Sequence, residues 1–162
     1  MRKLKTKKEI DCYIKTLEHK EQVADIMDVF AQVIRKRGLT HDNSKLEDPE
    51  FDGFVEYTPM LAQITYGSEE YQKCLDDLKP TLDAHYAKND SHPEFFRNGI
   101  RDMNLAQIIE MLADWYASCK RQNDGNIRQS IEKNRERFGY SKDLEQIFIN
   151  TVALIEMLDE NK

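Results

Sequence analysis

Apolar residues recur three and four positions apart along most of the chain, which is the spacing that places side chains on one face of an α-helix. Residues 103–122 show this spacing most clearly, with Leu105, Ile108, Leu112 and Cys119 in phase. No segment shows the strict alternation of apolar and polar residues that is typical of a half-buried strand. Only six glycines and four prolines interrupt the chain. The pattern therefore predicts an all-α fold.

Capping and helix-breaking residues predict where the helices begin and end. Thr6, with Glu9 three residues later, has the spacing of an N-terminal capping box. Gly38 is expected to end this first helix, and the apolar residues on much of its later half predict that this half is buried. Proline in the first helical turn predicts separate short helices at Pro49 and Pro59. The predicted helices span residues 6–37, 49–57, 59–65, 68–88, 103–122, 127–138 and 142–158.

Composition and charge narrow the classes of protein that remain. Of the 162 residues, 40% are hydrophobic and 33% are charged, which is typical of a globular protein. The length and the lack of a linker predict a single helical domain over residues 1–162, with residues 1–6 as a frayed tail. The formal net charge of −6 argues against nucleic acid as the main partner. No apolar run reaches the roughly 18 residues of a membrane span, and the N-terminus lacks an apolar signal segment.

The cysteines indicate the redox compartment. Cys12, Cys74 and Cys119 are odd in number, widely spaced and without a Cys-x-x-Cys pair. Reduced thiols are expected for such a set, which predicts a cytoplasmic protein.

Candidate chemistry begins at His41-Asp42, in the sequence THDNSK that follows the first predicted helix. Adjacent histidine and aspartate side chains can both ligate one metal ion if the backbone turns so that they converge. The same dipeptide also fits an aspartate that caps a helix beside an exposed histidine. Both interpretations stay open at this point.

Two further histidines lie seven residues apart. His85 is in phase with a run of leucines on helix 68–88, which predicts that it points inward. His92 follows in a loop before Pro93, and a helix end with its following loop can direct two imidazoles at one point. A hydrogen-bonded core histidine is the alternative interpretation of His85.

Asp114 lies on helix 103–122, opposite the apolar stripe and beside Glu110 and Arg121. A solvated polar face is one interpretation of this position. The apolar neighbours from Met111 to Ala117 favour burial instead, and a buried carboxylate would require a cation. A cluster of histidine and aspartate offers nitrogen and oxygen ligands, which suit Fe, Mn, Zn or Co better than Ca.

His19 is in phase with Val23, Ile26 and Phe30, which predicts that it also points inward. An unbroken helix from residue 19 to residue 37 would nevertheless place it roughly 27 Å from the His41 end, at a rise of about 1.5 Å per residue. Either this helix bends back, or His19 belongs to a different environment.

Together these residues resemble a known superfamily. The order His19…His41-Asp42…Asp114 resembles the H…HD…D pattern of the HD-domain metal-dependent phosphohydrolases, which are all-α. HDNSK is similar to their HD-x-x-K variant, and the other two histidines resemble the additional ligands of binuclear branches. The whole chain also resembles a small uncharacterised phage and bacterial family, through HDNSKLEDPE, HYAKNDSHPE and EMLADWYAS. The short segment between His19 and His41 departs from the superfamily because it contains no helical hairpin.

The superfamily resemblance implies a hydrolytic site in which one or two ions of Fe, Mn, Zn or Co activate water for attack on phosphorus. Lys45 would stabilise charge on the phosphoryl oxygens, and Glu94 would orient a water molecule or act as acid and base. The implied metal ligands are His41, Asp42, His85, His92, Asp114 and His19. The expected substrate contacts are Arg121, Tyr66, Tyr86 and Asn89. Tyr66, Tyr86 and Trp115 could stack on a base, and burial in the core is the alternative interpretation of these aromatic residues.

The implied substrate is a nucleotide or another small phosphoester. The alternative is a non-catalytic phage or bacterial accessory protein, in which the histidines are structural or retain metal without turnover. An oxidative di-metal protein is a third hypothesis, but it would need Glu-x-x-His pairs on facing helices. None of the four histidines has a glutamate three residues before it.

Overall fold

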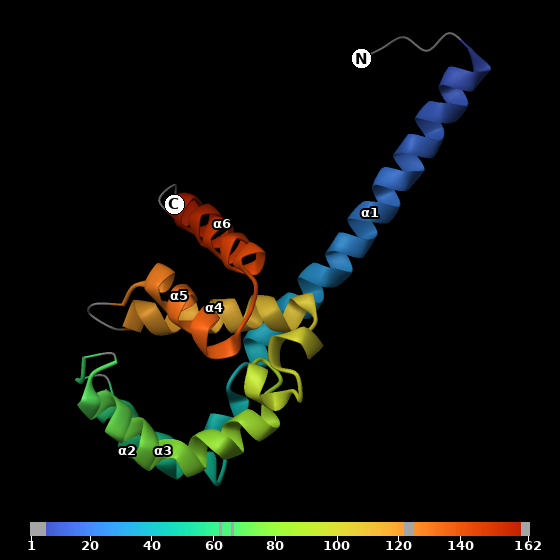
Figure 1. Cartoon of the computed structure of the whole chain (residues 1–162). Helices are drawn as coiled ribbons and strands as arrows, with labels where there is room; N and C mark the ends of the chain where they lie inside the picture. Colours follow the sequence, from blue (N-terminus) through green and yellow to red (C-terminus); the bar gives the residue numbers. More distant parts are fainter. Residues whose placement is uncertain (1–5, 62, 66, 122–124, 160–162) are drawn as a thin grey trace. The chain divides into compact units, whose positions relative to one another are not determined.

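The computed structural model describes residues 6–61, 63–65, 67–121 and 125–159. These residues form six α-helices and three short 3-10 helices, with no strand among them, so the prediction of an all-α fold is confirmed (Figure 1). None of the described helices has both the length and the apolar character needed to cross a membrane. The elements are α1 (Lys7–Thr40), η1 (Asn43–Leu46), α2 (Glu50–Leu61), α3 (Glu69–Lys88), η2 (Pro93–Phe95), η3 (Gly99–Asp102), α4 (Leu105–Arg121), α5 (Ile127–Phe138) and α6 (Lys142–Asp159).

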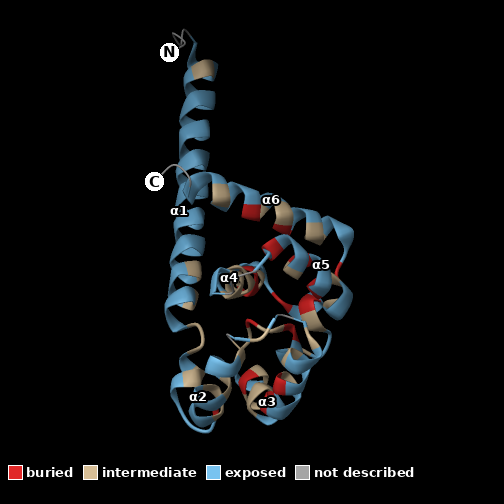
Figure 2. Cartoon of the chain, turned by 90° about the vertical axis from the view of Figure 1, so that its left-hand side faces the viewer, coloured by how far each residue is buried: buried red, intermediate tan, exposed pale blue. Residues whose placement is uncertain are grey.

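Residues 1–39 and 40–162 form two compact units. The first unit consists of α1, which begins with the predicted capping box: Thr6 N donates to Glu9 Oε2 over 2.9 Å, and Glu9 N donates to Thr6 Oγ1 over 3.2 Å. No residue of α1 is buried, and Figure 2 shows almost its whole length as exposed. The expectation of a buried later half, and of an inward-pointing His19, is therefore wrong. A lone helix has no second element within its unit to cover its apolar residues.

The hydrophobic core of the second unit lies among η3, α4, α5 and α6. Trp115 of α4 stacks on Phe138, with ring centroids 6.1 Å apart, and meets Phe148 of α6 edge-on. The Tyr140 hydroxyl donates to the Ile131 carbonyl oxygen over 2.5 Å, which satisfies a polar group that would be costly to bury alone. The buried core residues are Ile100, Met103, Met111, Leu112, Ile127, Ile131, Tyr140, Phe148 and Val152.

A second packed region joins α2, α3 and η1. Helix α2 continues through Pro59, so the prediction of two short helices is wrong, and α3 likewise continues through Pro80. A proline inside a helix removes one backbone hydrogen bond, and packing against a neighbouring helix can compensate for that loss. The α3 residues that turn inward are Cys74, Leu78 and His85. His85 is 1% exposed, as its helical phase predicted.

Candidate metal centre

Five histidine and aspartate side chains of the second unit form two overlapping groups. One group contains Asp42, His85 and His92, and the other contains His41, Asp42 and Asp114. Within each group the potential ligand atoms lie within 4.8 Å of one another. Asp42 belongs to both groups, so its carboxylate could contribute a ligand atom to either.

Backbone geometry at Asp42 explains how two adjacent residues can face the same point. Asp42 adopts a left-handed conformation, with φ 59° and ψ 14°, directly before η1. Aspartate tolerates this conformation better than most residues. As a result, Asp42 Oδ1 lies 3.4 Å from His41 Nε2 and also 3.4 Å from His85 Nε2. The turn therefore converts a sequence dipeptide into a convergent pair.

Carboxylates behind the cluster orient two of its histidines. His41 Nδ1 lies 2.9 Å from Glu110 Oε1, and His85 Nδ1 lies 2.8 Å from Glu50 Oε2. An Nδ1–H that donates to a carboxylate leaves the lone pair of a neutral imidazole on Nε2. In both residues Nε2 is the atom that faces Asp42. Metal-bound histidines are usually held in this way by a carboxylate or carbonyl on the other ring nitrogen.

Neighbouring charges and burial shift the pKa values of several residues in the cluster. Burial raises the pKa of the Asp42 carboxyl, but His85 and Lys45 outweigh burial and hold that pKa well below its usual range. The Asp114 carboxylate, 3.5 Å from His41 Nε2, raises the pKa of His41 to about 9. Burial and the neighbouring His85 ring lower the pKa of His92 to about 4, so this imidazole is neutral near pH 7.

The donor atoms present fit a divalent transition metal. His41 Nε2 and Asp42 Oδ1 are buried and make no close hydrogen bond. They lie 3.4 Å from each other, and a divalent ion could replace the proton that His41 carries and satisfy both atoms. His85 Nε2 and His92 Nε2 lie 3.0 Å apart. One group offers one nitrogen and two oxygens, and the other offers two nitrogens and one oxygen. Such mixed sets with open positions suit Fe, Mn, Co or Zn.

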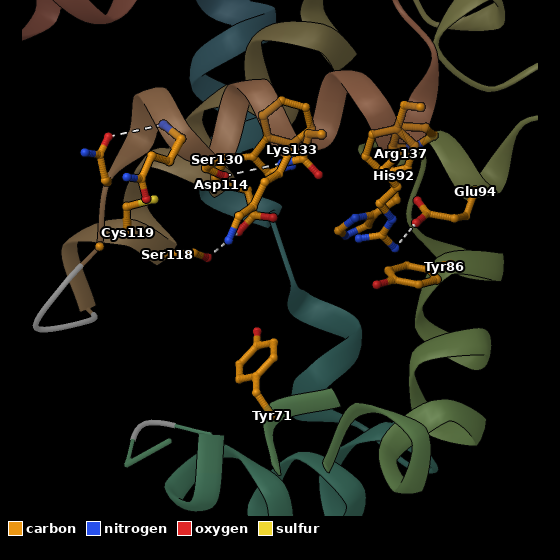
Figure 3. A pocket seen from close by; sticks show the side chains of 17 residues that line it. Tyr71, Tyr86, His92, Glu94, Asp114, Ser118, Cys119, Ser130, Lys133 and Arg137 are labelled. Atoms are coloured by element: carbon orange, nitrogen blue, oxygen red, sulfur yellow. Dashed lines mark hydrogen bonds and ion pairs between the residues drawn. The ribbon is translucent and has the colours of Figure 1, made fainter. Parts of the chain in front are cut away.

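A cavity of about 270 Å³ adjoins this cluster and is lined by His92 and Asp114. Its walls come from α3, α4 and α5, and Figure 3 shows Tyr71 facing the α4 and α5 side chains across the opening. Charged, polar and aromatic groups all line it. These include Tyr71, Tyr86, Glu94, Trp115, Ser118, Gln129, Ser130, Lys133, Asn134 and Arg137.

Comparison with known proteins places the chain in a family. Residues 8–158 match DUF5662, a family of unknown function. The chain belongs to this family. No curated protein matches the sequence, and no solved structure matches it.

In this DUF5662 chain, five of the six expected metal ligands come together, and the sixth does not join them. His19 is exposed on α1, within the first unit, and belongs to neither group of candidate ligands. The unbroken α1 helix provides no bend that would return His19 toward the His41 end. Metal binding by the five convergent residues stays a prediction.

The residues expected to act on substrate are placed unevenly around the DUF5662 site. Lys45 Nζ donates to Asp42 Oδ2 over 2.6 Å, and Tyr86, Glu94 and Trp115 line the cavity. Asn89 donates instead to Ser44 Oγ over 2.7 Å, behind His85. Arg121 is exposed at the end of α4, where it donates to Ser118 Oγ at the cavity wall over 3.0 Å. Tyr66 lies outside the described residues.

Sequence reasoning missed the residues that surround the ligands. The four-residue spacing placed Glu110 beside Asp114, but it did not indicate that Glu110 would contact His41. Glu50, which is 0% exposed, carried no local signal beyond its place near His41 in sequence. Lys133 and Arg137 also line the cavity. Their four-residue spacing on α5 suggested a shared face but not what that face would meet.

Proposed function

We propose that this protein is a metal-dependent phosphohydrolase that acts on a nucleotide or another small phosphoester. The observation that carries the proposal is the pair of three-ligand groups that share Asp42. Two closely spaced divalent ions are the arrangement that many phosphoester hydrolases use. A cavity that opens at His92 and Asp114 would give a small substrate access to the same point.

The ligand residues would hold one or two ions of Fe, Mn, Zn or Co. Such ions would supply an activated water molecule and positive charge at the phosphoryl oxygens. Glu50 and Glu110 would keep the histidine rings in the orientation that binding needs, so little reorganisation would accompany loading. The fixed Nε2 positions of His41 and His85 support this role.

Lys45 would act beside the ligand Asp42, whereas Glu94 lies at the cavity wall. Lys45 lies beside Asp42 and also 4.7 Å above the Phe54 ring. Its charge is therefore held close to the proposed reaction centre, where it could stabilise developing negative charge. Glu94 is paired with Arg137, whose Nη2 lies 2.5 Å from Glu94 Oε1. This ion pair favours positioning of Arg137 over the acid–base role expected for Glu94 from the sequence.

Elemental analysis of the purified protein tests the proposal directly. The chain should be prepared without chelators or a histidine tag, as wild type and as the His41→Ala, Asp42→Ala double variant. We expect one or two equivalents of metal in the wild type and loss of that metal in the variant. His19→Ala is the matched control, because it removes an exposed histidine of the first unit, and it should retain the metal.

A screen of phosphomonoesters, phosphodiesters and nucleotides would follow on the metal-loaded protein. Turnover that disappears in the double variant and persists in His19→Ala would support the hydrolase. Absence of metal even after reconstitution with Mn or Fe would overturn it. Metal without turnover of any phosphoester would favour the non-catalytic accessory protein instead.

A further inference from the structure

We propose that Lys133 and Arg137 of α5 form an anion-binding wall that holds the phosphoryl group of a small ligand in the cavity beside His92 and Asp114. The assignment of this ligand to a reaction rests on the proposed hydrolase function. The proposal of the binding wall itself is supported by the cavity and the side chains that line it. Neither residue is part of the superfamily pattern that the sequence resembles.

Helix α5 presents two faces with different chemistry. Ile127, Ile131 and Asn134 are buried on one side. Lys133 and Arg137 lie four residues apart, so their side chains project from neighbouring positions on another face, and both line the cavity. The helix is thus anchored by its apolar residues, while Lys133 and Arg137 line the same cavity as His92 and Asp114, and all four are labelled in Figure 3.

Arg137 is held in a defined position at the cavity wall. Its guanidinium donates to Glu94 over 2.5 Å and lies 4.8 Å above the ring of Phe138. A guanidinium carries five N–H donors in a planar fork, so one arginine can serve a carboxylate and a phosphoryl oxygen together. Because the side chain is already held in place, less conformational entropy is lost when a ligand binds.

Charge balance in the cavity indicates an anionic ligand once metal is bound. Among the lining residues, Glu94 and Asp114 are acidic, and Lys133 and Arg137 are basic. These four charges cancel, so the lining by itself carries no net charge, and divalent ions bound at the adjoining cluster would supply positive charge in excess of it. A phosphate monoester, which carries about −1.5 to −2 charge near pH 7, matches that excess.

Size and lining narrow the ligand to a small phosphomonoester. The volume of about 270 Å³ is close to the lower limit of roughly 300 Å³ for small-molecule pockets. A mononucleotide or a smaller ester therefore suits it better than a polymer. Tyr71, Tyr86 and Trp115 offer ring surfaces for the organic part of the ligand.

Calorimetric titration with inorganic phosphate tests the wall without requiring turnover. The proteins compared are the wild type, Arg137→Gln and Lys133→Gln, each as purified with its metal and again after chelation. Arg128→Gln is the matched control, because Arg128 lies on the same helix but pairs with Glu156 of α6 over 2.7 Å. Each cavity variant should weaken phosphate binding by about tenfold or more, as expected for loss of a charge-assisted hydrogen bond. The control should bind within about twofold of the wild type, which is within the spread of unrelated surface changes.

Metal content and phosphate affinity separate the two proposals. Variants that keep their metal and lose phosphate binding would support the wall. Variants that keep both would overturn the wall and leave the hydrolase proposal standing. If the wild type holds no metal, the hydrolase proposal fails, and the titration of the metal-free protein still decides: weaker binding in the cavity variants supports the wall, and no difference or no binding overturns it. A parallel titration with adenosine monophosphate separates a mononucleotide ligand from free phosphate, since only the former gains affinity from the aromatic lining.

Discussion

Glu110 Oε1 lies 2.9 Å from His41 Nδ1, and this contact determines which nitrogen of the His41 ring faces Asp42 and Asp114. Glu50 makes the equivalent contact with His85. Two histidines from distant parts of the second unit are therefore oriented by the same device. A carboxylate behind each ring is the feature that best distinguishes this cluster from a chance gathering of polar residues.

Loss of either supporting carboxylate should weaken metal binding while the ligands remain. We expect Glu110→Gln and Glu50→Gln each to lower metal affinity about 10- to 100-fold, because loss of such outer partners has that typical effect. Competition with a chromophoric chelator would measure it. Glu156→Gln is the control, since Glu156 pairs with Arg128 away from the cluster. Equal affinities in all three variants would contradict the orienting role.

Replacing Lys45 should separate metal binding from turnover. Its ammonium lies 2.6 Å from Asp42 Oδ2 and therefore opposes cation binding at the same carboxylate. We expect Lys45→Met to keep or increase its metal content and to lower kcat about 100-fold, the scale of a lost charge-stabilising donor. Elemental analysis and steady-state kinetics would give the two readouts. Unchanged kcat would mean that Lys45 only balances the charge of Asp42.

The kinetics of Glu94→Gln can show whether Glu94 moves a proton or only positions Arg137. A residue that moves a proton in the reaction should, when changed to Gln, lower kcat and remove one limb of its pH profile. If Glu94 only holds Arg137 in place, Glu94→Gln should raise KM for the phosphoester and leave the shape of the kcat profile intact. We expect the second result, because the Glu94 carboxylate is 2.5 Å from the guanidinium. A lost limb would restore the acid–base assignment.

Tyr140 should make the protein less stable in alkaline solution. Burial raises the pKa of its hydroxyl above the ordinary value of 10, and the hydroxyl donates to the Ile131 carbonyl. Because the folded-state pKa is the higher one, the unfolded chain loses this proton first. The contribution of Tyr140 is therefore complete below about pH 10 and declines as pH rises further.

Urea unfolding at pH 8 and at pH 10.5 would measure this contribution. Tyr140→Phe should lower the free energy of unfolding at pH 8 by about 1–2 kcal/mol, since it removes the hydrogen bond between the hydroxyl and the Ile131 carbonyl. Between pH 8 and pH 10.5, the free energy of unfolding of Tyr140→Phe should fall by less than that of the wild type. Tyr13→Phe, which alters an exposed tyrosine of α1, serves as the control. An identical alkaline loss in all three proteins would exclude Tyr140 as its source.

Local sequence patterns predicted the helices well because they depend on residues close together in the chain. The 3.6-residue period placed α4, α5 and α6 within a few residues of their observed bounds. The same period predicted that His85 turns inward. The period did not predict the exposure of α1. An apolar face shows only that burial would be favourable, and a second element must pack against that face to bury it.

The sequence by itself determined the helical class and the residue types from which a metal cluster could form. Only the tertiary structure decided which of those residues meet. His41 contacts a carboxylate of Glu110, which lies 69 positions away in the chain, and His19 joins no candidate ligand group among the described residues. Contacts of this kind arise when separate helices pack, so their partners are set by the relative orientation of whole elements. Helical periodicity relates residues within about two turns of one helix. It carries no information about contacts between residues far apart in the chain.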